Sequence, residues 1–182
     1  MQTTPTQRHS ILIDASSAIL LFKAGVLDHL LAAYRGVVAL SVYRELTAGD
    51  AYPGAREIAA LHQRGVLEVC TVPPAGEVMA KSDGVALATL GRGERDTLLY
   101  YLGGRGAFVV IDDGRGARCC RSGRIPFINA LLVPRIFSLA GKMTEERCAA
   151  AFEVLVVTGR YSPGILAWAR SAGRKELATF LP

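Results

Sequence analysis

The 182-residue chain lacks the features of several simple protein classes. Charged residues make up only 20% of it and hydrophobic residues 51%, which excludes a disordered chain, because such chains combine low hydrophobicity with high charge. No apolar run approaches the roughly 18 residues of a membrane span, so we expect no association with a membrane. The apolar run near 11–22 contains Asp14 and ends at Lys23, which argues against a signal peptide.

Cysteine and histidine are also scarce. The four cysteines show no CxxC spacing and there are only three histidines, so the sequence does not favour a zinc site. Without a secretion signal the cysteines should be reduced thiols, and we predict a cytoplasmic location. The adjacent Cys119 and Cys120 have two interpretations, a redox role or small buried apolar side chains. The phosphate-binding pattern GxxxxGK(S/T) is absent as well.

Lysine is rare among the basic residues. Of the 21 Lys and Arg residues 17 are Arg, and the formal net charge is +5. The planar arginine side chain matches phosphate oxygens, so this bias suits a nucleic-acid partner. The alternative is an Arg-rich genome composition, because net charge bears on partners and not on the fold.

What the chain does have is a regular alternation of short apolar runs with helical patterns, within the length of one ordinary domain. The runs predicted as strands are 10–14, 37–41, 67–72, 107–111 and 125–129. The segments predicted as helices include 16–34 with a break at Gly25, 55–64, 77–90, 114–122, 130–141, 144–157 and 163–180. Because the strands are continuous apolar runs, both faces of the sheet should be covered by helices. The predicted fold class is therefore α/β with a central parallel sheet.

Acidic residues lie around the ends of these predicted strands. Asp14 follows the first strand, and Asp112 and Asp113 follow the fourth. Glu45 lies on the helix after the second strand, and Glu94 begins the helix that leads into the fourth. Ligands of parallel sheets bind at the carboxyl ends of the strands, so we expect these acids to line one site.

Such a site calls for a cation, because a buried carboxylate without a partner is costly and no predicted strand carries Lys or Arg. Carboxylates without His or Cys favour Mg²⁺ or Mn²⁺. The alternative is that each acid caps a helix, since Asp14 before ASSAIL and Asp113 before GRGAR are acceptable N-caps. A phosphotransfer domain of the receiver type would need a strand-end Lys, which is absent here.

Four stretches, ILIDASSAI, VALSVYREL, LGRGERDTLL and VVIDDGRGARC, together resemble the PIN-domain family of metal-dependent ribonucleases, in particular nucleases related to VapC-type toxins. The resemblance covers residues 10–141 and implies a PIN-like three-layer α/β/α sandwich with a central parallel sheet. It leaves residues 1–9 as a flexible N-terminus and 142–182 as a C-terminal helical extension packed on the same domain.

The resemblance also implies roles for the acidic residues. The expected catalytic residues are Asp14, Glu45, Glu94 and Asp113, and the expected metal ligands are Asp14, Glu94, Asp112 and Asp113. Of the adjacent pair, Asp113 is the first choice and Asp112 the alternative. Ser16 and Asp96 are expected to support the site.

The implied activity is hydrolysis of RNA phosphodiester bonds with Mg²⁺ or Mn²⁺, as the toxin of a toxin–antitoxin pair. The implied partners are the RNA substrate, a protein antitoxin and a second copy in a homodimer. The alternative is a catalytically idle PIN-like module that binds RNA or a protein. Arginines around the acids are candidates for RNA phosphate contacts, or else belong to a solvated polar face: Arg92, Arg95, Arg115 and Arg118.

Overall fold

The computed structural model describes residues 8–49, 54–72 and 87–182. Residues 1–7, 50–53 and 73–86 lie outside the description. The predicted flexible N-terminus and the predicted helix over 77–90 therefore fall mainly outside the described residues.

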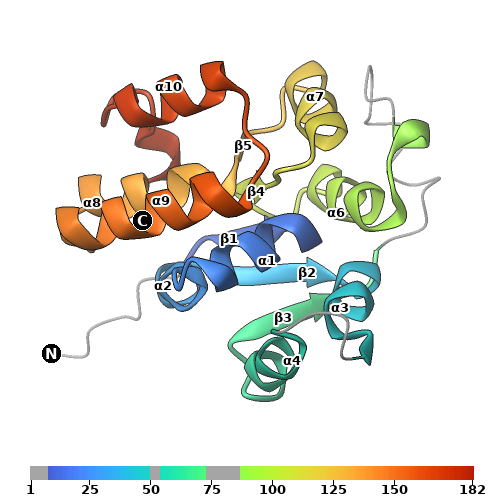
Figure 1. The fold of residues 1–182 in the computed structure, drawn as a ribbon. Helices are drawn as coiled ribbons and strands as arrows, with labels where there is room; N and C mark the ends of the chain where they lie inside the picture. The colour runs from blue at the N-terminus through green and yellow to red at the C-terminus, as the bar shows by residue number, and fades with distance from the viewer. Residues whose placement is uncertain (1–7, 50–53, 73–86) are drawn as a thin grey trace, which may run out of the picture.

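Five parallel strands form the central sheet (Figure 1). They are β1 (Ser10–Ile13), β2 (Arg35–Ala39), β3 (Leu67–Cys70), β4 (Phe108–Val110) and β5 (Phe127–Ile128), and their order across the sheet is β3-β2-β1-β4-β5. Leu12 of β1 pairs with Val37 of β2 on one side and with Val109 of β4 on the other. Strands β2 and β3 follow on one side of β1, and β4 and β5 follow on the other side. The strand order therefore reverses between β1 and β4, and ligands of parallel sheets bind at such a switch point.

Both faces of the central strands are buried, as the continuous apolar runs predict. Ile11 and Ile13 belong to one core and Leu12 to a second core, and all three side chains are fully inaccessible to solvent. The first core is covered by α1 (Ala15–Lys23), α2 (Leu27–Ala33), α8 (Val133–Leu139) and α9 (Glu145–Thr158). The second is covered by α6 (Arg92–Leu102) and α7 (Gly114–Ser122). This three-layer arrangement confirms the predicted fold class.

The remaining elements sit around this sandwich. Helix α3 (Leu40–Thr47) follows β2 directly and packs against α6, and α4 (Ala55–Gln63) packs against β3. Three short 3₁₀ turns, η2 (Leu87–Thr89), η3 (Ala130–Leu132) and η4 (Ala178–Phe180), and helix α10 (Pro163–Ser171) complete the described elements. Helix α9 packs against α1 and α8, so the C-terminal segment contributes to the first core.

The break predicted at Gly25 is present: α1 and α2 are separate helices on either side of it, and its φ of +66° favours glycine. The helix predicted over 163–180 ends at Ser171, because Ala172 takes an extended conformation and its carbonyl accepts a hydrogen bond from Arg135 Nε at 3.1 Å. Packing beyond that point holds the chain, since Leu177 is fully buried and the Phe180 carbonyl accepts from the Tyr34 hydroxyl.

The cysteine pair lies in the second core. Cys119 and Cys120 are both buried, and burial raises the pKa of the Cys120 thiol to about 12. A protonated, enclosed thiol is a poor nucleophile, which favours the interpretation as small apolar side chains.

No single helix among the described residues has the length and apolar character needed to cross a membrane. Helices α1 and α2 taken together meet that test by length and composition alone, but they are bent by 113° relative to each other.

The tight contact between β2 and its neighbours makes Gly36 a sensitive position. A Cβ there would collide with Leu31 Cδ2 and come within 3.4 Å of Ile13 Cδ1. We expect Gly36→Ala to lower the free energy of unfolding by about 1–3 kcal/mol through overpacking, measured by urea denaturation. Gly164→Ala is the control, since nothing lies within 4 Å of its Cβ position, and it should be neutral or slightly stabilising. Equal stability of the two variants would contradict the packing argument.

Candidate active site

Asp14 lies where β1 passes into α1, and it is the N-cap of that helix. Its Oδ2 accepts hydrogen bonds from the Ser16 backbone N–H at 3.2 Å and from Ser16 Oγ at 2.6 Å. Its own N–H donates to the Val110 carbonyl at 3.0 Å, which ties the end of β1 to β4. Burial raises the pKa of Asp14, the Ser16 hydrogen bonds oppose that rise, and the charge of Asp112 adds to it. Ser16 thus holds the carboxylate of Asp14 by two hydrogen bonds, and its role in an active site stays a prediction.

Asp113 holds the equivalent place after β4, as the N-cap of α7. Its Oδ1 accepts from the backbone N–H groups of Arg115 at 2.7 Å and Gly116 at 3.2 Å, and Arg115 Nε lies 3.8 Å from the same oxygen. Burial alone would raise the pKa of Asp113, but these backbone donors, together with Glu94 and the Arg115 charge, hold it below its ordinary value. Asp113 is therefore ionised at neutral pH.

Glu94 approaches from the first turn of α6, where its Oε2 accepts the Gly91 N–H at 3.1 Å. Burial raises its pKa, and the negative charges of Asp113 and Asp14 raise it further. The Glu94 and Asp113 carboxyl groups lie within hydrogen-bonding reach of each other. The two pKa values are thus shifted in opposite directions, so Glu94 is the more readily protonated of the two carboxyl groups.

Asp112, although adjacent to Asp113, is held by protein donors on both carboxylate oxygens. Its Oδ2 accepts Ser17 Oγ at 2.6 Å and the Ala130 N–H at 2.9 Å, and its Oδ1 accepts the Tyr161 hydroxyl at 2.6 Å. Burial raises its pKa, and the same three hydrogen bonds oppose the rise. A metal-ligand role for Asp112 stays a prediction that these engaged oxygens do not favour, and Asp113 is the better placed of the two.

Glu45 lies on α3 beside the first turn of α6, and its predicted catalytic role stays a prediction. The residue is exposed, and its Oε2 lies 3.4 Å from the position that a Cβ on Gly93 would take. Val42 Cγ2 lies 3.1 Å from the same position, so the absence of a side chain at residue 93 lets α3 lie against the first turn of α6. Glu45 is thus a neighbour of the turn that carries Glu94.

Two contacts in the site were missed by reasoning from the sequence, Ser17 and Tyr161. Ser17 is fully buried on α1, one residue beyond the predicted Ser16. Tyr161 lies 49 residues from its partner Asp112, just after the end of α9. Ser17 could have been identified from the sequence, because a polar side chain near the start of a predicted buried helix needs a hydrogen-bond partner. No local sequence pattern identifies Tyr161.

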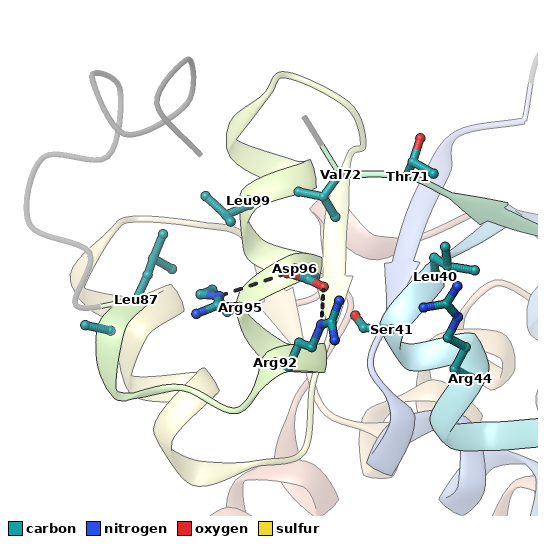
Figure 2. A pocket seen from close by; sticks show the side chains of 11 residues that line it. Leu40, Ser41, Arg44, Thr71, Val72, Leu87, Arg92, Arg95, Asp96 and Leu99 are labelled. Carbon is teal, nitrogen blue, oxygen red and sulfur yellow. Dashed lines mark ion pairs between the residues drawn. The ribbon is translucent and has the colours of Figure 1, made fainter. Parts of the chain in front are cut away.

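Asp96 lines a pocket of about 640 Å³ beside α3 (Figure 2). Its carboxylate lies 3.9 Å from Arg92 Nε and 4.0 Å from Arg95 Nε. Arg92 and Arg95, two of the arginines predicted to contact RNA phosphates, therefore line this pocket. Arg115, a third, lies beside Asp113. Arg118 is exposed on the next turn of α7.

The donor set at the sheet edge fits a hard divalent cation. The negative charges of Asp113 and Asp14 raise the pKa of Glu94, and a bound cation would offset this repulsion between the carboxylates. Among the described residues, no group of three or more His, Cys, Asp or Glu side chains is arranged to hold a metal by protein ligands alone. Mg²⁺ needs only one or two carboxylates from a protein, because it keeps several waters or takes phosphate oxygens.

The chain belongs to the PIN-domain family. A family profile described as a PIN domain matches residues 10–162, which include every acid discussed above and Tyr161. PIN domains have a nuclease-type fold, the family generally consists of nucleases, and its members typically depend on a divalent metal. A comparison with curated proteins finds no match.

The raised pKa of buried Asp14 has a consequence for stability. The folded state binds the Asp14 proton more tightly than the unfolded chain, so stability falls as the pH rises above the ordinary value of 3.8. In EDTA at pH 7, Asp14→Asn should therefore raise Tm, by roughly 2–4 °C for each kcal/mol gained in a chain of this size. The gain should shrink as the pH is lowered toward 3.8, where the wild-type carboxyl is protonated in both states.

Thermal melts at several pH values measure this difference. Asp28→Asn, at an exposed position in the first turn of α2, is the matched control and should lower Tm slightly, because it removes a charge that favours the helix N-terminus. A lower Tm for Asp14→Asn at pH 7, or a gain that does not depend on pH, would contradict a desolvated carboxylate at this position.

Proposed function

We propose that this PIN domain is a ribonuclease that hydrolyses RNA phosphodiester bonds with Mg²⁺ or Mn²⁺. One observation carries the proposal. Three separate elements, the end of β1 and the first turns of α6 and α7, bring Asp14, Glu94 and Asp113 to the switch point of the sheet, where their charges destabilise one another. Such a cluster lowers the stability of the folded protein unless a cation binds there, so it is better explained by function than by helix capping alone.

In this proposal each acid has its own part. Asp113, whose pKa is lowered, would supply negative charge to a bound cation, and Glu94 would be a second carboxylate ligand. Ser16 fixes the rotamer of Asp14. A divalent ion held by these carboxylates would supply an activated water and charge stabilisation for the leaving oxygen of an in-line displacement.

The donors around Asp112 hold the backbone that presents Asp113. Ser17 joins Asp112 to α1, Ala130 joins it to the turn after β5, and Tyr161 joins it to the segment after α9. The loop between β4 and α7 is therefore fixed from three directions. Rigid placement of an acid is what a catalytic carboxylate requires, because small displacements cost large factors in rate.

Basic side chains lie on both sides of these acids. Arg92 and Arg95 line the pocket beside α3, and a second hollow of about 410 Å³ is lined by Asp113 together with Lys23 and Arg160. A polyanion that crosses the acids would meet cations before and after them. This distribution supports RNA as the substrate, with contacts to phosphates that position the strand without reading its sequence.

The proposal extends to a toxin that is held by a protein antitoxin and forms a homodimer. It is supported by an apolar surface on the C-terminal helices, where the Val157 side chain is 83% exposed and Trp168 46% exposed, with Val154 and Ile165 also exposed. Exposed apolar side chains of this kind on neighbouring elements are typical of protein interaction sites.

Cleavage of a single-stranded RNA in Mg²⁺ or Mn²⁺ tests the activity. We expect Asp14→Asn, Glu94→Gln and Asp113→Asn to lower the rate by roughly a hundredfold or more, the scale of losing one group that stabilises transition-state charge. Asp28→Asn should cleave like the wild type. Cleavage that survives these substitutions or EDTA would contradict the proposal, and RNA binding without cleavage at any metal concentration would favour the idle module.

A metal titration gives a second measurement that does not depend on activity. Mn²⁺ at a hundred times its Kd should stabilise the wild type by about 2.7 kcal/mol. Asp113→Asn should lose this stabilisation while Asp28→Asn keeps it. Equal stabilisation of both variants would place the ion elsewhere.

The dimer is tested at Val157. Val157→Glu should weaken self-association by about tenfold or more, because it places a charge in an apolar contact, and sedimentation equilibrium measures the change. Val66→Glu, at another exposed apolar position, is the control. A wild-type chain that remains monomeric at all concentrations would contradict the homodimer.

A further inference from the structure

We propose that the pocket between α3 and α6 binds a guanine base of the RNA substrate, next to the bond that is cut. This inference rests on the proposed ribonuclease function. It assigns a role to Asp96, Ser41 and Arg44, which the cluster of Asp14, Glu94 and Asp113 leaves unused.

The walls of the pocket suit a flat aromatic ring. Leu40, Val72, Leu87 and Leu99 supply apolar surface, and the volume of about 640 Å³ is in the range of small-molecule sites. Figure 2 shows Leu99 and Val72 on one side of the hollow and Leu40 on the other. A base that enters between them would bury both faces of its ring against apolar side chains.

Within the described part of the chain, the pocket contains a hydroxyl without a hydrogen-bond partner and a carboxylate whose recorded partners are two long ion pairs. Ser41 Oγ is buried and unpartnered within the described part of the chain. The Asp96 side chain is only 18% exposed, and among the described residues its carboxylate accepts no hydrogen bond, since Arg92 and Arg95 stay 3.9 and 4.0 Å away. Figure 2 shows the Ser41 hydroxyl, the Asp96 carboxylate and the Arg92 guanidinium turned toward one another across the gap between the helices. A buried hydroxyl without a partner is uncommon, and a polar ligand beside Ser41 and Asp96 would account for it.

The chemistry of these groups selects guanine. A carboxylate only accepts hydrogen bonds, and it has two oxygens side by side. Guanine presents two adjacent N–H donors, N1–H and the N2 amino group, which match this pair. Adenine, cytosine and uracil each place an acceptor beside their donor on the same edge, and that acceptor would face a carboxylate oxygen. Arg44, Arg92 and Arg95 at the pocket then carry charge suited to the phosphates on either side of the base.

The position of the pocket connects it to the acids. Ser41 and Arg44 lie on the same helix as Glu45, and Arg92, Arg95 and Asp96 lie on the same helix as Glu94. The Gly93 backbone brings the two helices into contact at the site itself. A nucleotide in the pocket is therefore a neighbour of a phosphate at the acids, so base recognition there would set where the strand is cut.

Binding of nucleoside 5′-monophosphates in EDTA tests the pocket without any catalysis. GMP should bind at least about tenfold more tightly than AMP, CMP or UMP, the scale of one bidentate base contact. Asp96→Asn should abolish this preference and favour AMP, because an amide pairs an acceptor and a donor with those of adenine. Asp28→Asn should bind like the wild type. Absence of a GMP preference, or a preference unchanged in Asp96→Asn, would overturn the proposal.

Ser41→Ala separates binding from folding. Removing an unpartnered buried hydroxyl should leave Tm unchanged or raise it, while weakening GMP binding. Unaltered GMP binding in this variant would overturn the part assigned to Ser41.

Cleavage of an RNA pool with a randomised segment, followed by sequencing of the cut ends, distinguishes a base in the strand from a free nucleotide. We expect guanine at one fixed position beside the cut, and a shift toward adenine in Asp96→Asn. Cleavage without guanine enrichment would overturn the RNA-base proposal and leave the ribonuclease intact, even if GMP binds. Absence of all cleavage would instead refute the proposed function, while the GMP titration still decides the pocket.

Discussion

Complete burial of β1 between two cores and two neighbouring strands is the constraint from which the rest of the structure follows. Because neighbouring strands and helices cover β1, the chain continues only from its carboxyl end, and Asp14 is the first residue beyond that end. Because β4 pairs with β1 in parallel register, its last residues reach the same edge, and Asp112 and Asp113 follow there. The hydrophobic burial that fixes the sheet thus also forces acidic side chains into one desolvated region.

The two adjacent aspartates show how the fold separates structure from chemistry within one dipeptide. Successive residues of an extended segment point in opposite directions. Asp112 accepts hydrogen bonds from Ser17, Ala130 and Tyr161, whereas Asp113 interacts with Glu94. The Asp112 carboxylate holds the loop in place, and the Asp113 carboxylate interacts with Glu94. Removing Asp112 would therefore loosen the loop, whereas removing Asp113 would change the charge of the site.

Charge is segregated over this edge of the sheet. The three interacting acids lie between two hollows that each carry basic side chains, Arg92 and Arg95 in one and Lys23 and Arg160 in the other. A net charge of +5 averages over these regions of opposite sign. Cations are attracted to the acids and phosphates to the surrounding arginines, which is the arrangement that metal-assisted chemistry on a polyanion needs.

The sequence by itself determined the sheet, its parallel sense and the end of the strand at which each acid lies, because continuous apolar runs and strand-terminal aspartates are local patterns. It also identified Asp14, Glu94 and Asp113 as candidates, whose proximity the structure shows and whose catalytic role stays a prediction. Only the tertiary structure decided which aspartate of the pair faces Glu94, that Tyr161 reaches Asp112, and that Asp96 opens into a separate pocket with Ser41. These contacts join residues far apart in the chain, and their geometry depends on how helices pack, which no local pattern encodes.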